Sequence, residues 1–374
     1  MPATSSRHGT LLRVPWVLVH FVIGYGAILA LIFVPYIQTL AVYGHHRGFS
    51  ATPNFSSPED YGLAPGKAVN LYITSADNTT LGAWFVTSET YYRSLPFPVQ
   101  TIDIPVALKQ RPTILFLHGK SGHRAIPRRI AVYSALSSRL NANILAVDYR
   151  GFGDSEGSPT IAGVASDARA AWDFLFVHGA RPQDVLIVGH SLGTAIAALL
   201  AAELGRDSIS PLGLVLLAPF ASLRTVIHEY YILGFLPLFK PLAMAPALTR
   251  FLLGLATHPF DTLGLLPNIT SSVLIAHAED DGAFPHAHAD MLFDAFLELI
   301  PATSPIPSNM DSVARQAELR RRLATVQEIP GFGKLEEAQR GERKFALLKT
   351  VAGTHDILRV EGVQDVMGRM FNLI

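Results

Sequence analysis

From Thr113 onward, short apolar runs alternate with longer stretches in which apolar residues recur at helical spacing. A strand buried on both faces is apolar throughout, whereas a covering helix is apolar along one side. The alternation therefore predicts an α/β fold with a mostly parallel central sheet flanked by helices. The predicted strands are Thr113–Leu117, Ile144–Val147, Val185–Val188, Gly213–Leu217, Ser272–Ala276 and Phe345–Thr350. The predicted helices are Ile130–Leu140, Ile161–Val177, Leu192–Leu204, His288–Leu299 and Val360–Phe371.

An antiparallel hairpin is predicted ahead of this pattern. Its strands are Val69–Thr74 and Ala83–Thr87, which flank the polar segment Ser75–Thr80. The segment from Thr90 to Arg111 contains several prolines and is predicted to be a loop.

Two segments interrupt the alternation. Residues 219–267 are apolar, aromatic and punctuated by prolines, and this density of apolar side chains outside the sheet needs burial, a ligand or a bilayer. Residues 301–344 are polar and charged, with a predicted helix over Val313–Val326, and are interpreted as a solvated insertion.

The amino-terminal region contains the longest apolar stretch. From Val14 to His46 there is no Asp, Glu, Lys or Arg, and Trp16 and Tyr43 lie near its ends as interfacial aromatic residues do. Its length predicts a single transmembrane helix over about 14–43, which Pro35 would bend. The expected organisation is an anchor segment at 1–47, a linker at 48–66 and the main domain at 67–374.

The flanking charges suggest an orientation for this anchor. Arg7 and Arg13 precede the span and Arg47 follows it, which favours a cytosolic amino terminus and a lumenal main domain. Sequons at Asn54, Asn78 and Asn268 agree with exposure to a glycosylating lumen. The expected location is the endoplasmic reticulum or another endomembrane.

Composition excludes several classes of function. The 374 residues include 30 basic and 30 acidic side chains, so the formal net charge is zero. The chain therefore lacks the excess of positive charge that would indicate a nucleic-acid partner. Cysteine is absent, which excludes a disulfide framework, a thiolate metal site and a cysteine nucleophile.

The principal chemical motif is Gly189-His190-Ser191-Leu192-Gly193, between the strand that ends at Val188 and an alanine-rich helix. A Gly-x-Ser-x-Gly sequence in this position is typical of a nucleophile elbow, whose sharp turn exposes the serine hydroxyl. The alternative without a catalytic role is a strand-to-helix turn in which Ser191 only caps the helix. The elbow predicts Ser191 as a nucleophile and the backbone N–H of Leu192 as an oxyanion donor.

A serine nucleophile needs an imidazole base and a carboxylate to orient that base. Candidates for both groups follow two later predicted strands. Acidic residues follow Ser272–Ala276, and His355, the predicted base, follows Phe345–Thr350. The carboxylates considered are Glu279, Asp280, Asp281 and Asp356.

Together these motifs resemble the α/β-hydrolases, and within them the membrane-anchored abhydrolase-domain lipases. The similar stretches are Leu117-His118-Gly119, Asp148–Gly157, Gly189–Gly193, His277–Asp281 and Gly353-Thr354-His355, and the resemblance covers roughly residues 67–374. In that family the acid stands four residues before a proline, which selects Asp281 over Asp280. The resemblance also implies that the turn after His118-Gly119 supplies the second oxyanion donor, Lys120 first and Ser121 second. It further implies that His118 and His190 are structural.

Two other site types were weighed. Gly151, Gly153 and Gly157 follow a strand as in a dinucleotide loop, but the spacing is wrong by one residue, and Asp154 and Glu156 would oppose a pyrophosphate. A second group has residue types that bind metals, but it lacks a metalloprotease motif: His277, Asp280, Asp281, His286, His288 and Asp290. No cofactor and no metal are therefore expected.

The resemblance implies a membrane-anchored serine hydrolase that cleaves carboxylic esters of lipids, either a lysophospholipid or a monoacylglycerol. The resemblance also implies a helical cap at 219–267, which would bind the acyl chain through side chains that the sequence does not identify. The alternatives are a serine hydrolase acting on thioesters, palmitoylated proteins or peptides, and a membrane scaffold with the same fold but no turnover.

Overall fold

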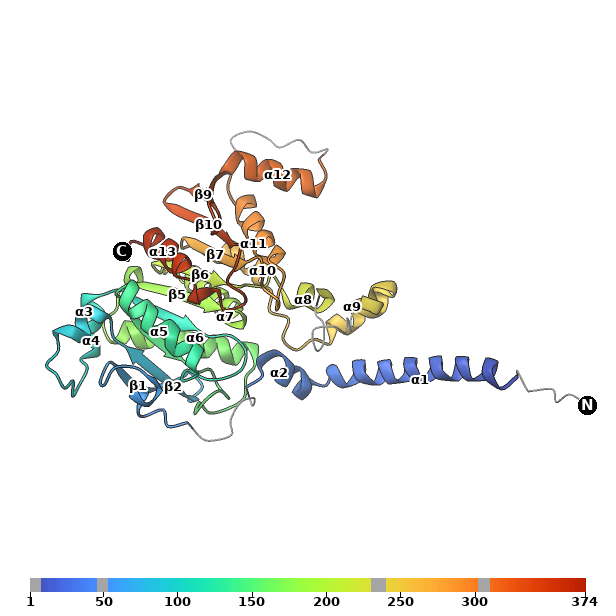
Figure 1. The fold of residues 1–374 in the computed structure, drawn as a ribbon, viewed down its shortest axis with the longest axis horizontal. Coiled ribbons are helices and arrows are strands. Elements are labelled where there is room, and N and C mark those ends of the chain that lie inside the picture. The colour runs from blue at the N-terminus through green and yellow to red at the C-terminus, as the bar shows by residue number, and fades with distance from the viewer. Residues whose placement is uncertain (1–7, 46–52, 230–239, 302–309) are drawn as a thin grey trace, which may run out of the picture.

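The computed structural model describes residues 8–45, 53–229, 240–301 and 310–374 (Figure 1). Within these ranges, ten strands form one sheet in the order β1-β2-β4-β3-β5-β6-β7-β10-β9-β8. Parallel pairing joins β4, β3, β5, β6, β7 and β10. Antiparallel pairing adds β2 and β1 beside β4, and β9 and β8 beside β10. Their bounds are β1 Ala68–Thr74, β2 Thr80–Val86, β3 Thr113–Leu117, β4 Asn143–Val147, β5 Val185–His190, β6 Gly213–Leu217, β7 Val273–Ala278, β8 Ala324–Ile329, β9 Gly333–Arg340 and β10 Arg343–Thr350.

Helices cover both faces of this sheet (Figure 1). Alternate residues of a strand point to opposite faces, so β3 contributes Leu115 and Leu117 to one cluster and Ile114 and Phe116 to the other. The first cluster also contains α6 Ile161–Val177, α7 Leu192–Arg206 and α11 Ala287–Glu298, and the second contains α5 Pro127–Arg139 and α13 Glu361–Met370. The parallel sheet with helices on both faces confirms the predicted α/β fold.

The region expected to be a loop contains two short helices, α3 Glu89–Ser94 and α4 Ile104–Gln110. The side chain of Asp103 caps α4 by accepting a hydrogen bond from the N–H of Val106 at 3.0 Å. Prolines suggested a loop here, but Pro105 lies in the first turn of α4, where its missing N–H is tolerated.

The polar insertion differs most from the expectation. Its helix is α12 Ser312–Leu323, and Val326 lies in β8 rather than in this helix. The strands β9 and β8 then extend the central sheet beyond β10 by antiparallel pairing. The segment is therefore an integral edge of the sheet, and most of the β8 side chains are exposed.

The amino-terminal apolar stretch forms two helices, α1 His8–Ile32 and α2 Pro35–Tyr43. No single described helix is long and apolar enough to cross a bilayer; Val19–Ile32 and Pro35–Tyr43 meet that requirement only as a pair bent by 77°. Pro35 occupies the first turn of α2, which agrees with the predicted bend. The α1 helix projects from the body, whereas α2 lies against it and buries Gln38 and Tyr43 (Figure 1).

The predicted cap contains α8 Leu223–Glu229, α9 Pro246–Gly254 and α10 Thr262–Leu265. Residues 230–239, which include several of its aromatic side chains, lie outside the described residues. The carboxyl-terminal end of α1 contacts the cap through Leu29 and Leu242.

Candidate active site

Ser191 lies at the turn between β5 and α7. Its backbone has φ of 53° and ψ of −121°, a region that non-glycine residues rarely adopt. The flanking glycines are required by close packing: a Cβ atom on Gly189 would lie 2.7 Å from the carbonyl carbon of Gly193, and one on Gly193 would lie 2.7 Å from the carbonyl oxygen of His118. The sequence pattern thus produces a strained elbow that presents the Ser191 side chain.

Strand register brings the remaining groups to this elbow. Leu117 pairs with Gly189, which places the turn after β3 beside Ser191. Thr350 pairs with Ala278, which places the loop after β10 beside the loop after β7. The carboxyl ends of neighbouring parallel strands therefore gather the predicted nucleophile, base and acid at one edge of the sheet.

The side chains of Ser191, His355 and Asp281 form one hydrogen-bonded chain. Nε2 of His355 lies 2.8 Å from Oγ of Ser191, and Nδ1 of His355 lies 2.8 Å from Oδ2 of Asp281. An ionised carboxylate can only accept hydrogen bonds, so Nδ1 carries a proton and Nε2 can accept the hydroxyl proton of Ser191. This geometry suits removal of the serine proton during nucleophilic attack.

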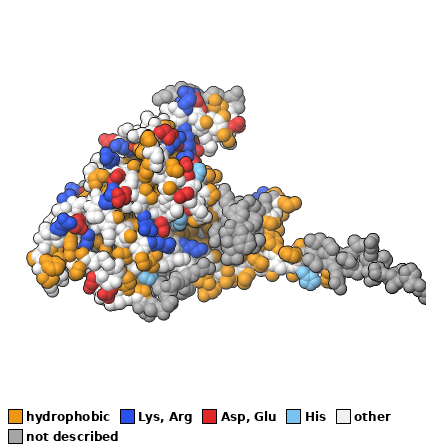
Figure 2. Space-filling model, in the orientation of Figure 1, with side chains coloured by type: hydrophobic (Ala, Val, Ile, Leu, Met, Phe, Trp, Pro, Cys, Tyr) orange, Lys and Arg blue, Asp and Glu red, His pale blue; other side chains and the backbone are white. Residues whose placement is uncertain are grey.

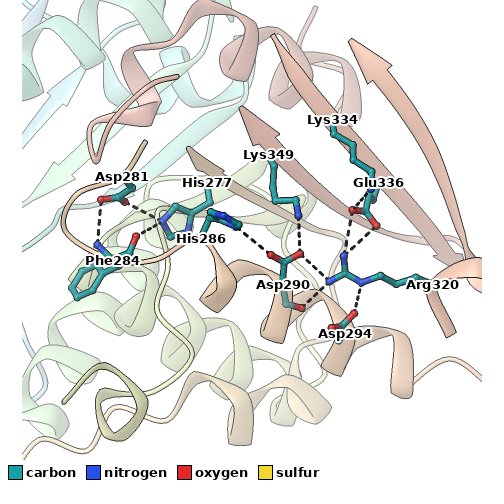
Figure 3. Close-up of polar contacts among 10 residues, drawn as sticks. All are labelled: His277, Asp281, Phe284, His286, Asp290, Asp294, Arg320, Lys334, Glu336 and Lys349. Carbon is teal, nitrogen blue, oxygen red and sulfur yellow. Dashed lines mark hydrogen bonds and ion pairs between the residues drawn. The ribbon is translucent and has the colours of Figure 1, made fainter. Parts of the chain in front are cut away.

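Asp281 is the candidate acid whose carboxylate meets His355. Its fully buried side chain accepts four hydrogen bonds, from His355, from Nε2 of His277 at 3.0 Å, and from the N–H groups of Ala283 and Phe284 at 2.7 and 3.2 Å (Figure 3 shows the His277 and Phe284 contacts). Burial alone would raise the pKa of Asp281, but the hydrogen bonds from His277 and His355 outweigh burial and lower that pKa. Asp281 is therefore held as an anion.

The other three carboxylates lie elsewhere. Oδ1 of Asp280 accepts a hydrogen bond from the N–H of Thr354 at 2.7 Å, which ties the acid loop to the histidine loop. Glu279 is exposed, and Asp356 precedes the short 3₁₀ helix Ile357–Arg359.

The turn after β3 lies opposite the elbow and is held by Arg129. Nη2 of this buried arginine donates to the carbonyl oxygens of Gly119 and Ser121, at 2.9 and 2.7 Å. The N–H of Ser121 donates to the carbonyl oxygen of Tyr43 at 2.9 Å. Because that N–H already has an acceptor, Ser121 is less suited to be the upstream oxyanion donor. On the other side, the N–H of Leu192 is the first of α7, and intrahelical bonding leaves such groups unpaired.

His118, which is buried, and His190, which is partly buried, lie beside the site rather than in the proton-transfer chain. Nδ1 of His118 donates to the carbonyl oxygen of Gly119 at 2.8 Å, and Nε2 of His190 donates to that of His355 at 2.8 Å. Burial lowers the pKa of each imidazole to about 4, so both are neutral near pH 7. Their positions agree with the structural roles that the resemblance implied.

A cavity of about 630 Å³ opens beside Ser191. Among the described residues that line it, three are basic and one, Asp281, is acidic and is already engaged by two histidines. The lining residues are Gly119, Lys120, Ser121, Arg128, Arg129, His190, Ser191, Asp281, Gly282, Ala283, Phe284, Pro285 and His355.

The residues of the glycine-rich loop serve the fold. Arg124 is fully buried and binds Asp148 and Asp154 at 2.7 and 2.6 Å. Glu156 accepts a hydrogen bond from the N–H of Thr80 at 2.9 Å. These carboxylates therefore fasten the loop to Arg124 and to the first hairpin, and they do not face an open phosphate site.

Four of the six residues with metal-binding side chains form two separate contacts. His277 binds Asp281, whereas His286 lies 3.4 Å from Asp290, which in turn binds Lys349 and Arg320 (Figure 3). Among the described residues, no group of three or more His, Cys, Asp or Glu side chains is arranged to hold a metal ion.

Sequence reasoning missed the roles of Arg129, Asp280 and His277. Arg129 lies in no recognisable motif, and residue type alone does not distinguish a buried arginine in a helix from an exposed one. His277 belongs to the group of residue types from which no metal site was expected, and its sequence position does not indicate a hydrogen bond to the candidate acid.

Known proteins are similar to this chain over most of its length. A model of the alpha/beta hydrolase family matches residues 114–343. Lysophosphatidylserine lipase ABHD12 of Bos taurus is 31% identical over 304 residues, which cover 76% of this chain and 70% of that protein. Its counterpart in Gallus gallus is 29% identical over 354 residues, covering 87% of this chain and 86% of that protein.

Solved structures show the same fold. An alpha-beta hydrolase from Vibrio vulnificus has a TM-score of 0.55 at 16% identity, covering 93% of this chain and 94% of its own. An esterase from Pyrococcus furiosus has a TM-score of 0.51 at 15% identity, covering 88% and 97%. The family model, which spans more than half of the chain, and the relatives named above confirm the resemblance that the motifs indicated. The chain belongs to the alpha/beta hydrolase family, within its abhydrolase-domain serine hydrolases.

Proposed function

We propose that this protein is a membrane-anchored serine hydrolase that cleaves the acyl ester of an anionic lysophospholipid, with Ser191 as the nucleophile. As an abhydrolase-domain serine hydrolase, the chain is a carboxylic ester hydrolase. The observation that carries the proposal is the hydrogen-bonded chain from Ser191 through His355 to Asp281. The relatives named lysophosphatidylserine lipase support a lipid substrate.

In the proposed reaction, Nε2 of His355 takes the hydroxyl proton as Oγ of Ser191 attacks the ester carbonyl. Negative charge develops on the carbonyl oxygen, where the N–H groups of Leu192 and Lys120 would stabilise it. His355 then gives its proton to the departing glycerol oxygen, which leaves an acyl-serine ester. Water deprotonated by His355 releases the fatty acid, while the Asp281 anion stabilises the imidazolium in both steps.

The charge of the cavity favours a lysophospholipid over a monoacylglycerol. Both substrates contain the same acyl ester, but only the phospholipid carries an anionic head group. Lys120, Arg128 and Arg129 line the cavity beside Ser191, and a phosphate is stabilised by such donors. Arg128 is exposed at the surface, where it can meet a head group that enters from outside.

The surface near the cap supports access from a membrane. Figure 2 shows hydrophobic side chains gathered on the cap and at the base of the amino-terminal helix. Met244 and Phe251 of the cap are among the exposed apolar side chains, and α1 carries several more. We propose that the bent pair of α1 and α2 anchors the protein, so that its cavity draws substrate from the bilayer.

We also propose that the main domain lies in the lumen of the endoplasmic reticulum or of another endomembrane. Asn54, Asn78 and Asn268, the asparagines of the three sequons, are all exposed. Digestion with a glycosidase tests this placement: the full-length protein should gain mobility on a gel, and a triple Asn→Gln variant should not. If the wild-type protein carries no glycan, the lumenal placement is wrong.

The substrate proposal is tested by comparing kcat/KM for lysophosphatidylserine, lysophosphatidylcholine and a monoacylglycerol with the same acyl chain. The wild type should prefer the anionic lipid, and Ser191→Ala should hydrolyse none of them. Arg128→Gln should lower the preference for the anionic head group about fivefold or more, because a charged hydrogen bond contributes roughly 1.5 kcal/mol. Arg206→Gln, at the exposed end of α7 and outside the cavity lining, is the matched control.

Three outcomes would contradict the proposal. A preference for the monoacylglycerol would exclude the anionic head group as the determinant. Faster cleavage of a palmitoyl thioester or of a peptide would assign the same triad to another substrate class. Failure of the folded wild type to react with a fluorophosphonate would indicate a scaffold without turnover.

A further inference from the structure

The end of the amino-terminal apolar segment touches the turn that faces Ser191. The carbonyl oxygen of Tyr43, the last residue of α2, accepts a hydrogen bond from the N–H of Ser121 at 2.9 Å. Tyr43 itself is fully buried, so this contact is shielded from water. A segment expected only to anchor the chain therefore supplies an acceptor to the candidate oxyanion turn.

Gly44 makes this approach possible. It terminates α2 in the left-handed conformation, with φ of 59° and ψ of 26°, and its N–H donates to the carbonyl oxygen of Leu40 at 3.0 Å. A Cβ atom at this position would clash with Oγ of Ser121 and would lie 3.3 Å from Cε of Lys120. Helix α2 thus packs directly against both residues that follow Gly119.

The other side of α2 is fastened to the cap. The buried amide of Gln38 donates to the carbonyl oxygen of Leu255 at 3.1 Å and accepts from the N–H and hydroxyl of Thr257 at 2.8 and 3.0 Å. Oγ1 of Thr39 lies 3.0 Å from Nε2 of His258. A short helix therefore bridges the carboxyl-terminal part of the cap and the turn beside the nucleophile.

We propose that α2 is a positioning element of the active site, which holds the Lys120–Ser121 turn in the geometry that an oxyanion hole requires. The proposal deepens the proposed function, since it rests on the oxyanion role of the turn. Arg129 fixes the carbonyl oxygens at Gly119 and Ser121, and α2 fixes the N–H of Ser121. These three contacts hold the backbone on both sides of Lys120, whose N–H is the predicted second oxyanion donor.

Such a role affects the transition state more than the ground state. Oxyanion donors act because they are oriented before the charge develops, and a displacement of about 1 Å can lower the rate by roughly 100-fold. A displaced turn should therefore lower kcat and weaken binding of a transition-state analogue, while KM stays nearly constant.

Gly44→Ala tests the contact in the full-length protein. Its new methyl group pushes against Ser121, and we expect kcat to fall about tenfold or more with KM changed less than about twofold. The affinity for a trifluoromethyl ketone, which forms a tetrahedral adduct, should weaken by the same factor. Gly24→Ala is the matched control, because a Cβ at Gly24 meets no atom within 4 Å and it lies in the same apolar segment.

A double-mutant cycle separates this effect from general misfolding. Ser121→Gly removes the hydroxyl that the methyl group meets, and glycine fits the φ of 64° at this position. We expect Gly44→Ala with Ser121→Gly to reach a kcat within about threefold of Ser121→Gly alone. An unchanged kcat in Gly44→Ala, a change confined to KM, or no rescue in the double variant would each overturn the proposal.

The substrate used for this test is a p-nitrophenyl ester, with the rate of fluorophosphonate labelling as a second readout. Both report the nucleophile and the oxyanion turn, and neither depends on head-group recognition. If the wild type hydrolyses the simple ester but not a lysophospholipid, the lipid proposal fails while the role of α2 is still measured.

Discussion

Nε2 of His277 lies 3.0 Å from Oδ2 of Asp281, the same oxygen atom that lies 2.8 Å from Nδ1 of His355. A second contact at 3.2 Å joins Nε2 of His277 to the carbonyl oxygen of Phe284 (Figure 3). Both partners are acceptors, so Nε2 of His277 carries the proton. One buried imidazole thereby holds the two ends of the acid loop together, and the Phe284 ring packs edge-on to His355, with centroids 5.5 Å apart.

Replacing His277 by phenylalanine should lower kcat/KM about 10- to 100-fold. The ring keeps its volume but loses the N–H, and a hydrogen bond to a charged group contributes roughly 1.5–3 kcal/mol. His277→Gln, whose amide can donate from a similar position, should retain most of the activity. The pKa of Asp281 should rise in the phenylalanine variant, which NMR of the labelled carboxylate can measure. Equal losses in both variants, with no change in that pKa, would show that only packing matters.

Asp281→Asn and Asp280→Asn should differ sharply. In Asp281→Asn the amide no longer stabilises the imidazolium, and loss of such a carboxylate lowers kcat by roughly 10³- to 10⁴-fold in serine hydrolases. In Asp280→Asn the carbonyl oxygen of the new amide can still accept the hydrogen bond from Thr354, so kcat should fall less than about tenfold. Steady-state hydrolysis of a p-nitrophenyl ester measures both. A larger loss at Asp280 would reverse the assignment of the acid.

Stability should decline as the pH falls from about 6.5 toward 4. Burial lowers the pKa of His118 and of His190 from 6.5 to about 4, so between these values the unfolded chain binds protons that the folded protein does not. The folded state therefore loses up to about 3 kcal/mol per histidine across this range, with little further loss below pH 4 from these two groups. Urea unfolding in detergent at pH 7.5, 5.5 and 4.5 measures the slope. His118→Asn should make the slope shallower, and an unchanged slope would contradict the assignment.

Arg320 should contribute more to stability than its neighbour Arg321. The guanidinium of Arg320, which is 22% exposed, contacts Asp294, Asp290 and Glu336 at 2.5, 3.0 and 3.3 Å and joins α12 to α11 and β9 (Figure 3). Arg320→Gln leaves those partly buried carboxylates close together and should lower the free energy of unfolding by about 3 kcal/mol.

Arg321→Gln is the control for this change. That side chain is 70% exposed and pairs only with Glu318 among the described residues, so its loss should change stability by about 0.5 kcal/mol or less. Similar midpoints for the two variants in thermal unfolding would show that the cluster does not hold the insertion to the sheet.

Local patterns were sufficient to predict the centre of the fold. The strands at Thr113–Leu117 and Gly213–Leu217 have the predicted bounds because buried parallel strands are apolar in nearly every position. The elbow at Ser191 could also be predicted from the sequence, because a side chain at Gly189 would clash with residues only a few positions away.

Features that depend on distant partners were not predicted. Strands β8 and β9 are polar, so their sequence resembles that of exposed segments. They become strands through tertiary pairing, because β9 pairs with β10 and β8 pairs with β9. The role of His277 follows from a loop that folds back onto it. The docking of α2 was hidden for the same reason: nothing in the sequence near Tyr43 indicates that its carbonyl oxygen meets Ser121.

The hairpin of β8 and β9 has a consequence for neighbouring copies of the protein. Without it, β10 would end the sheet, and its buried residues Phe345, Leu347 and Leu348 would adjoin an open row of backbone donors and acceptors. Such edges recruit strands from other chains and promote aggregation. The hairpin moves the edge outward to a strand whose exposed side chains include Gln327 and Glu328. Where copies of the protein lie close together, this polar border would keep their sheets from joining.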